Sequence, residues 1–384
     1  MFWTLHTQIL LITHKLYNNR MLIIRKILYV INILLALLLL CTYLPAFVPQ
    51  DILSKISLLG YVYPFALVGN LAFVLLWLVW KPKNLFLSLV VICLRIDYIP
   101  RLVNYSSSKA EDGDIKVLTY NVKDFVYGME EGKYIGMNAL SDSIVEYVAS
   151  TGADVLCFQD YDVNTKWKHG FHYKLVDSLG YNNFYYYHLG SVTADNVAIY
   201  SKYKIVDCGS VAEDLNEKDC LIYADIRTNN GVVRVYNLHL KSYMLGKKEK
   251  NDYKDIVKGN LQNSTKEDTK NIIDKLLSAN RYRAVQTRYI IAEIEKVQLP
   301  VIICGDFNDH PFSNTYRKFT NKFSDSFVSK GRGVGGSYNG PFPMYRIDYI
   351  LFNKNRLECV GYETKRVDFS DHYPIVSTFK IKKQ

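Results

Sequence analysis

The fold of this chain is decided by the stretch Val301-Ile-Ile-Cys-Gly-Asp-Phe-Asn-Asp-His310. Residues 301–304 are apolar and mostly β-branched, which predicts a strand that is buried on both faces. Gly305 allows a tight bend and a close approach to a ligand. Asp306 and Asn308 follow at the strand's exit, two residues apart, so both side chains can point into one cleft. A carboxylate next to an amide that donates and accepts suits a site for both a cation and a phosphate oxygen.

Length, charge and cysteine content set the outer limits of the interpretation. The chain has 384 residues, a formal net charge of +10 and 7 Cys. This length allows more than one domain. The positive charge favours anionic partners, namely phosphate, a membrane surface or nucleic acid, although many of the Lys residues are ordinary solvated surface. The cysteines form no CxxC pair and no disulfide framework, so they do not indicate a redox compartment.

The first hundred residues contain long apolar runs. Residues 27–48 and 58–80 are each long enough to cross a bilayer as a helix, which takes about 20 residues. Residues 85–94 form a shorter run, which becomes a third span if Ile96, Tyr98 and Ile99 extend it and Arg95 reaches the interface. We expect an integral inner or plasma membrane protein rather than a cleaved signal peptide, because the first run is long and another follows it.

Basic residues at the ends of these runs predict their orientation. Arg20, Arg25 and Lys26 precede the first run, and Lys81 and Lys83 follow the second, which places both groups in the cytoplasm. Three spans put the C-terminal domain outside the cytoplasm and two keep it inside; we favour three. The predicted layout is a membrane region at 1–104, a polar linker at 105–114 and a soluble domain at 115–384.

The soluble domain alternates strand-like and helix-like segments, and polar residues follow the strands. We expect helices at 140–149 and 272–297, and strands at 115–120, 154–158, 184–188, 197–200, 220–228, 232–240, 346–352 and after Pro374. Asn121, Asp160 and His239 stand at the ends of three of these strands. A carboxylate at the end of a buried strand is costly unless it meets a cation or hydrogen-bond donors.

Six separated segments together resemble the endonuclease/exonuclease/phosphatase superfamily, the group related to deoxyribonuclease I and neutral sphingomyelinase. In chain order they are Tyr120-Asn121, Phe158-Gln159-Asp160, Asn237-Leu-His239-Leu, Gly305-Asp306-Phe307-Asn308, Arg346-Ile-Asp348-Tyr and Ser370-Asp371-His372. The resemblance covers residues 115–384. It implies an α/β (α+β) fold, a four-layered sandwich of two packed mixed sheets with helices outside. The N-terminal transmembrane helical region lies outside it and resembles that of membrane-anchored bacterial members.

The resemblance also implies roles for the polar residues. Asn121, Asp160 and Asp371 would hold Mg²⁺ or Mn²⁺, directly or through water. Asn121, Asn308 and His239 would bind the phosphate, and His239 would also serve the leaving oxygen.

For catalysis, the resemblance implies that His372 is the general base, with Asp348 on its other ring nitrogen. Asp306 would orient or help activate the attacking water. We therefore expect the rate to rise with pH through the titration of His372 near neutrality.

Two positions depart from the family pattern. The family nearly always has Gln-Glu where this chain has Gln159-Asp160. Asp is one methylene shorter, about 1.5 Å, so water would intervene between its carboxylate and a metal ion. Asn196 stands where relatives often carry Gly, which concerns a turn more than the chemistry.

These observations predict a membrane-anchored, metal-dependent hydrolase of phosphoesters, with phosphodiesters as the favoured class. Its expected partners are the lipid bilayer and an anionic phosphoester substrate, a lipid headgroup or a nucleic acid; no obligate protein partner is evident. The alternative is a catalytically impaired phosphate- or lipid-binding module, and only Asp160 supports it.

Overall fold

The computed structural model describes residues 2–106, 111–125, 137–161, 168–187, 196–211, 220–243, 265–340 and 345–383, with a few more between 246 and 252. The chain divides into two compact units. The first contains residues 1–44 and 58–96, and the second contains Pro45–Ser57 and Asp97–Gln384. Most of residues 241–270, and His188 of the predicted 184–188 strand, lie outside the described residues.

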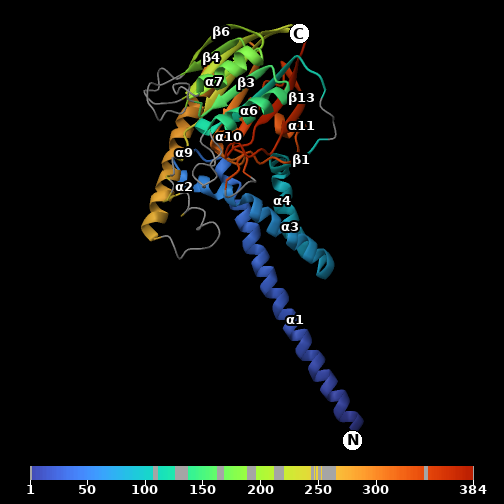
Figure 1. Cartoon of the computed structure of the whole chain (residues 1–384). Helices are drawn as coiled ribbons and strands as arrows, with labels where there is room; N and C mark the ends of the chain where they lie inside the picture. The colour runs from blue at the N-terminus through green and yellow to red at the C-terminus, as the bar shows by residue number, and fades with distance from the viewer. Residues whose placement is uncertain are drawn as a thin grey trace. The chain divides into compact units, whose positions relative to one another are not determined.

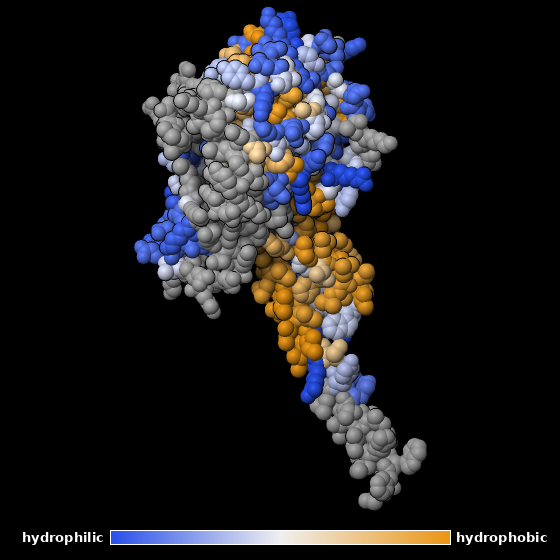
Figure 2. Space-filling model, in the orientation of Figure 1, coloured by the Kyte–Doolittle hydropathy of each residue, from blue (hydrophilic) through white to orange (hydrophobic). Residues whose placement is uncertain are grey.

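The first unit is built from three apolar helices, α1 (Phe2–Cys41), α3 (Tyr63–Trp80) and α4 (Leu85–Leu94). Two stretches, Tyr17–Ala46 and Ser54–Trp80, are long and apolar enough to cross a membrane, and a shorter apolar one runs over Pro82–Leu94. Their outward side chains are apolar and exposed: Leu34 is 61% exposed, Leu75 66% and Val79 87%. Figure 2 shows this apolar surface in orange.

Polar side chains inside these helices bind one another instead of facing outward. The Asn32 amide donates to Ser88 Oγ at 2.6 Å and accepts from Trp77 Nε1 at 2.8 Å. Ser88 in turn donates to Asn70 Oδ1 at 2.8 Å. All four side chains are buried. Hydrogen bonds of this kind hold helices together where the surroundings are apolar, so α1, α3 and α4 form one bundle.

The second unit contains two mixed sheets of six strands each, packed face to face (Figure 1). The first sheet has the order β13 (Leu357–Thr364), β14 (Ile375–Ile381), β2 (Ile115–Asn121), β3 (Val155–Gln159), β5 (Val197–Ser201) and β4 (Asn183–Tyr187). The second has the order β10 (Ser324–Asp325), β12 (Asp348–Phe352), β9 (Val301–Asp306), β8 (Gly231–His239), β7 (Cys220–Thr228) and β6 (Lys204–Ser210). The pairs β2/β3 and β8/β9 are parallel, and every other pair is antiparallel.

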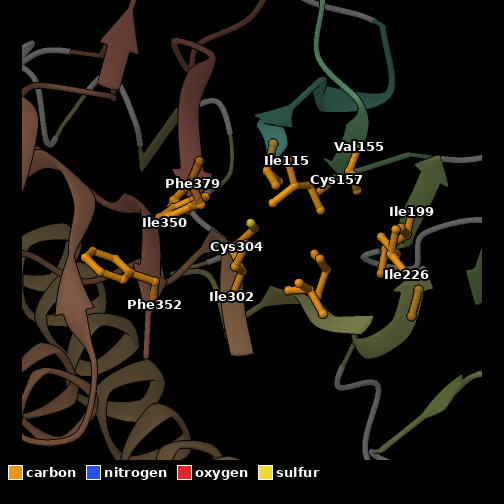
Figure 3. Close-up of a cluster of buried hydrophobic side chains, with 14 of the residues drawn as sticks. Ile115, Val155, Cys157, Ile199, Ile226, Ile302, Cys304, Ile350, Phe352 and Phe379 are labelled. Atoms are coloured by element: carbon orange, nitrogen blue, oxygen red, sulfur yellow. The ribbon is translucent and has the colours of Figure 1, made fainter. Parts of the chain in front are cut away.

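The core between the sheets is made by alternate strand residues from both sides. Figure 3 shows Cys157 and Ile199 from the first sheet facing Ile302, Cys304 and Ile226 from the second. Successive side chains of a strand point to opposite faces, so the other set of residues faces outward and needs its own cover. Helices supply that cover.

Helices pack on the outer face of each sheet. On the first sheet, Ile144 and Val148 of α6 (Met137–Thr151) pack in one cluster with Leu118 and Leu156. The short α7 (Lys168–Tyr173) adds Phe171 to the same cluster. The predicted four-layered α/β sandwich is therefore confirmed.

On the second sheet, the covering helices are α9 (Lys266–Ile294) and α10 (Asn314–Thr320). Thr265 caps α9 in a capping box with Asp268, and the Ser313 side chain caps α10. Ile290 of α9 and Tyr316 of α10 pack in one cluster with Ile303 of β9.

Smaller elements complete the second unit: α2 (Ser54–Ser57), α5 (Ile99–Leu102), β1 (Val103–Tyr105), α11 (Ser326–Lys330) and β11 (Arg332–Val334). β1 pairs with β11 in a separate two-stranded sheet. We expected the soluble domain to begin at residue 115, but its compact unit also includes Pro45–Ser57 and the chain from Asp97 onward.

Candidate active site

The ends of three neighbouring strands bring an acid, a histidine and a second acid side by side. In the second sheet, Asp306 at the end of β9 pairs with His239 at the end of β8. On its other side, Asp306 pairs with Asp348, the first residue of β12. The strand register alone therefore places Asp306 between His239 and Asp348, as expected for polar residues at strand exits.

Four polar groups converge on the Asp306 carboxylate. Its Oδ2 lies 3.6 Å from His239 Nε2 and 3.7 Å from His372 Nε2, and it accepts from Asn121 Nδ2 at 3.2 Å. Its Oδ1 accepts from the Asn308 backbone N–H at 2.8 Å. The Asp306 side chain is 1% exposed. A carboxylate so deeply buried is stable only with such partners.

His372 lies between two carboxylates. Its Nδ1 is 2.9 Å from Asp348 Oδ2, and its Nε2 faces Asp306. The Asp348 contact fixes the ring orientation and selects the Nδ1–H tautomer, which leaves Nε2 directed at the centre of the site.

Two further acids flank this centre nearer to solvent. Asp160 Oδ1 lies 3.3 Å from His239 Nδ1, and Asp371 Oδ1 lies 4.0 Å from His372 Nε2. Their side chains are 27% and 16% exposed. All the predicted site residues, Asn121, Asp160, His239, Asp306, Asn308, Asp348, Asp371 and His372, are thus linked by contacts into one group; their individual roles stay predictions.

Lys123 is a site residue that the sequence analysis missed. Its Nζ lies 2.5 Å from Asp371 Oδ2. It follows Asn121 by two residues, and no motif or spacing marks it as functional. Only the convergence of β2 with the loop after residue 369 brings its charge to the site.

The backbone beside Lys123 is strained. Lys123, Asp124 and Phe125 have φ values of 46°, 49° and 57°, and Asp160 has 46°. Each non-glycine residue in this left-handed region costs about 1–3 kcal/mol. The Asp124 N–H donates to the Asp160 carbonyl at 2.7 Å, which couples the two loops. These left-handed conformations place Lys123 and Asp160 at the edge of the site.

Asn308 is also held in an uncommon conformation. Its φ is 51°, and its Nδ2 donates to the Leu240 carbonyl at 2.9 Å. The preceding Gly305 has a φ of 140°, and a Cβ there would lie 1.9 Å from the Leu238 carbonyl oxygen. Only glycine fits at this position, which explains the glycine in the opening motif.

A buried amide network supports the base of the site. Gln159 Nε2 donates to Asn237 Oδ1 at 2.6 Å and to Thr119 Oγ1 at 2.9 Å. Asn237 Nδ2 donates to the carbonyls of Phe158 and Ala198, at 2.8 and 2.9 Å. These bonds join β8 of the second sheet to the strand ends of the first. Gln159 and Asn237 therefore fix the relative positions of the strand ends that carry the site residues.

The electrostatics differ from our expectation for His372. Burial, together with the neighbouring Asp348, raises the pKa of Asp306 to about 6, although His372 and His239 act in the opposite direction. Burial alone would lower the pKa of His372, but Asp348 and Asp306 overcome this and raise it to about 10. The prediction of a titration near neutrality is therefore wrong for the protein without a metal ion, because two carboxylates stabilise the imidazolium.

The donor set suits a divalent cation. Within the part of the chain that the structure describes, Asp306, Asp348 and His372 form a group whose ligand atoms lie within 4.8 Å of one another. We predicted these residues for catalysis, and Asn121, Asp160 and Asp371 for the metal. Carboxylate and amide oxygens are the ligands that Mg²⁺ and Mn²⁺ prefer. Burial is the main cause of the raised pKa of Asp306, and a cation bound beside the carboxylate would lower that pKa.

Comparison with known families agrees with this arrangement. The model of the Endonuclease/Exonuclease/phosphatase family matches residues 118–372, about two thirds of the chain. The chain belongs to this family. A second model, described only as a domain of unknown function, matches residues 25–102. No curated protein sequence matches this chain.

Solved structures of the family share the fold. An endonuclease/exonuclease/phosphatase from Bacteroides vulgatus is 14% identical, with a TM-score of 0.50, over 70% of this chain and 99% of that one. The human Nocturnin catalytic domain with bound sulfate is 17% identical over 72% and 97%, with a TM-score of 0.49. An AP endonuclease from Archaeoglobus fulgidus is 17% identical over 69% and 99%, with a TM-score of 0.45. At such identities the Bacteroides likeness supports the fold alone.

Proposed function

We propose that this family member is a membrane-anchored, metal-dependent phosphoesterase that acts on phosphodiesters by attack of water. The observation that carries the proposal is the position of Asp306 Oδ2, within 3.7 Å of two histidines and 3.2 Å of Asn121. Such a group can orient a water molecule and a phosphate together. Apolar helices with outward-facing Leu and Val side chains support the anchoring.

Asn121 and two acids would hold the metal ion. Asn121, Asp160 and Asp371 surround the buried Asp306–His372 pair, and their oxygens would complete the coordination directly or through water. Mg²⁺ or Mn²⁺ bound there would supply charge neutralisation and polarisation of the phosphoryl group. The shorter Asp160, which also contacts His239, favours contact through water.

The protein's own side chains would move the protons. Asp348 orients His372, whose Nε2 accepts the proton of the attacking water and shares it with Asp306. His239 approaches Asp306 from the other side and would stabilise the phosphate or protonate the leaving oxygen. Asn308 would hold a phosphate oxygen. This division resembles other His–Asp pairs, in which the acid orients the base and stabilises its charged form.

Removal of metal should abolish turnover. With bis(p-nitrophenyl) phosphate as substrate, we expect EDTA to eliminate release of p-nitrophenol and added Mg²⁺ or Mn²⁺ to restore it. The control is the same titration with a molar excess of Mg²⁺ or Mn²⁺ over EDTA, in which free metal ion remains available throughout. An enzyme indifferent to EDTA would refute the metal-dependent mechanism.

Replacement of Asp348 should change the pH profile as well as the rate. Asp348→Asn removes the nearest negative charge from His372, so the pKa of the imidazole should fall. The rising limb of the rate–pH profile should then move to lower pH, while the maximal rate drops about 10²–10⁴-fold because the ring is no longer oriented. Initial rates between pH 6 and 10 at saturating Mg²⁺ would show this. A profile at the parent position would argue for another base.

The competing function, an impaired binding module, rests on Asp160 alone. If the site works as an enzyme, Asp160→Glu should change kcat by less than about tenfold, because water can fill the missing methylene. A gain of several orders of magnitude from near zero would favour the impaired module. The matched control is Asp142→Glu on the outer helix α6, where the side chain is 49% exposed.

The substrate class can be decided by salt. The net charge of +10 fits both a nucleic acid and an anionic headgroup. Binding that follows a nucleic-acid backbone should weaken about 10³–10⁵-fold between 50 and 200 mM salt, whereas hydrolysis of one lipid headgroup should respond much less. We propose a lipid phosphodiester, because anchoring would keep the site near headgroups. A panel of single-stranded DNA and sphingomyelin or phosphatidylglycerol vesicles at both salt concentrations tests this.

A further inference from the structure

The segment between the first two apolar helices, Pro45–Ser57, is part of the catalytic unit. It belongs to the same compact unit as residues 97–384. Sequence analysis placed it within the membrane region at 1–104, with residues 45–48 in the first apolar run. Its contacts show that it fills a gap behind the catalytic turn.

The first set of contacts is centred on Gln50, which is 1% exposed. Gln50 Nε2 donates to Asp309 Oδ2 at 3.0 Å, and its Oε1 accepts from Thr315 at 3.1 Å. Asp309, also 1% exposed, follows Asn308 directly. The amide therefore satisfies a buried carboxylate one residue beyond the proposed phosphate-binding Asn308.

The second set is centred on Ser57. Its hydroxyl accepts from Asn280 of α9, and its carbonyl oxygen lies 3.4 Å from His310 Nε2. Asn280 in turn accepts from Arg283, whose Nε is 3.8 Å from Asp309. His310 and Arg283 are fully buried. Without Ser57 and Gln50, this cluster of charged and polar groups would lose several of its partners.

Three further contacts extend the same interface. The Ala46 carbonyl accepts from Asn314 at 2.8 Å, and Asp51 pairs with Arg288 at 2.6 Å. The guanidinium of Arg317 lies 4.2 Å from the centre of the Phe47 ring. The segment is therefore attached along most of its length to α9, α10 and the turn between β9 and α10.

The chain after the third apolar helix joins the same region. Tyr98 packs against Phe312 with ring centres 5.3 Å apart, and Arg101 donates to the Pro311 carbonyl at 3.2 Å. The chain therefore enters the catalytic unit twice, first between α1 and α3 and again after α4. Buried hydrogen bonds of this kind cannot form between groups on opposite sides of a bilayer.

We propose that Pro45–Ser57 and the catalytic domain lie on one side of the membrane, so that the chain crosses three times and the active site faces away from the cytoplasm. α1 crosses once, and α3 and α4 together must return the chain to the side of Pro45–Ser57. The basic residues Arg20, Arg25 and Lys26, which precede the apolar stretch of α1, and Lys81 and Lys83 between α3 and α4 place the other side in the cytoplasm. The inference rests on the membrane anchoring in the proposed function, and not on its chemistry.

The third apolar stretch is shorter than the other two. α4 has 10 residues, about 15 Å of rise. The preceding 3₁₀ turn Pro82–Asn84, of 3 residues, adds about 6 Å. The sum of about 21 Å is less than the thickness of a bilayer's hydrocarbon core, about 30 Å, so local thinning of the bilayer completes the crossing. Ser88 is hydrogen-bonded inside the bundle, so α4 presents apolar side chains outward.

The interface is tested by exchanging its partners in the full chain. Gln50→Glu puts a carboxylate against Asp309 and should lower the Tm of the detergent-solubilised protein by about 4 °C or more. In Gln50→Glu/Asp309→Asn, the amide and carboxylate change places, and most of the loss should be recovered. Ile52→Ala, at a residue 74% exposed, is the control and should leave Tm unchanged. An unchanged Tm in Gln50→Glu, or no recovery in the double variant, would contradict the interface.

The topology is tested by labelling single cysteines in whole cells. In a Cys208→Ser background, which removes an exposed thiol of the catalytic unit, the variants are Ile52→Cys, Lys322→Cys and Asn19→Cys. All three positions are exposed. We expect a membrane-impermeant maleimide to label the first two in intact cells, and Asn19→Cys only after permeabilisation. Counts from the background protein are subtracted.

Each other labelling pattern overturns the proposal in a definite way. If Ile52→Cys and Lys322→Cys react on different sides, the two segments do not share a side. If both react only after permeabilisation, the domain faces the cytoplasm. If all three react in intact cells, α1 does not cross. If the unaltered protein shows no phosphoesterase activity, that result contradicts the proposed chemistry and leaves the topology standing.

Discussion

Asp306→Asn is expected to lower the turnover of bis(p-nitrophenyl) phosphate by at least about 10³-fold. The change keeps the size of the side chain and removes its charge. The Asp306 carboxylate is approached by His239, His372 and Asn121, and an amide can neither accept a proton from the histidines nor offer a cation a negative charge. Steady-state kcat at saturating Mg²⁺ is the measurement. His372→Ala should give a loss of the same order.

The loss must be separated from unfolding. Asp142→Asn on α6, where the side chain is 49% exposed, is the matched control and should keep full activity. Both active-site variants should show a cooperative thermal transition near that of the parent, because the amide network of Gln159 and Asn237 is intact. Retained turnover in either variant would count against the assignment of the site.

The largest expected loss of stability comes from Asp325→Ala. Asp325 Oδ2 lies 2.5 Å from Arg346 Nη1 and accepts from the Tyr316 hydroxyl at 2.7 Å. The two charged side chains are 3% and 2% exposed. Removal of the carboxylate leaves a guanidinium buried without its counter-ion, which typically costs 3–5 kcal/mol. Denaturant unfolding of the full chain in detergent should show a fall of about that size.

A double variant tells the ion pair from simple packing. In Arg346→Met/Asp325→Ala no charge is left buried, so the loss should be clearly smaller than in Asp325→Ala. The rings of Phe327 and Tyr349, each 4.7 Å from the guanidinium carbon, can pack against Met. A single variant that loses less than about 1 kcal/mol would show that water reaches Arg346.

The strand ends could be read from the sequence because local pattern and burial agree there. β9 is apolar until Gly305 and polar after it, and β2, β3 and β8 end in the same way. A side chain at a strand exit has few directions open to it. The sequence could therefore predict that Asn121, His239 and Asp306 lie close together. The site residues were chosen by their resemblance to a family, and the structure brings all of them together.

Other features depend on contacts that no local pattern marks. β6 exposes much of its surface and has weak alternation, so it was missed. Lys123 reaches the site only through three consecutive left-handed residues. The pKa of His372 depends on two acids from other segments, Asp306 and Asp348. Pro45–Ser57 reads as a loop between apolar runs because its partners lie more than two hundred residues away.

The short strand β1 has a practical consequence for anyone who prepares a water-soluble form of this protein. Val103–Tyr105 covers the edge of β11, Asn104 donates to the carbonyls of Phe327 and Val328 at 2.8 Å, and the Arg101 carbonyl accepts from Arg346 at 3.2 Å. A truncation after the polar stretch near residue 110 would strip these partners away and uncover a strand edge that favours aggregation. Cutting at Asp97 preserves them but still removes Pro45–Ser57, whose Gln50 and Ser57 bind buried groups of the catalytic unit.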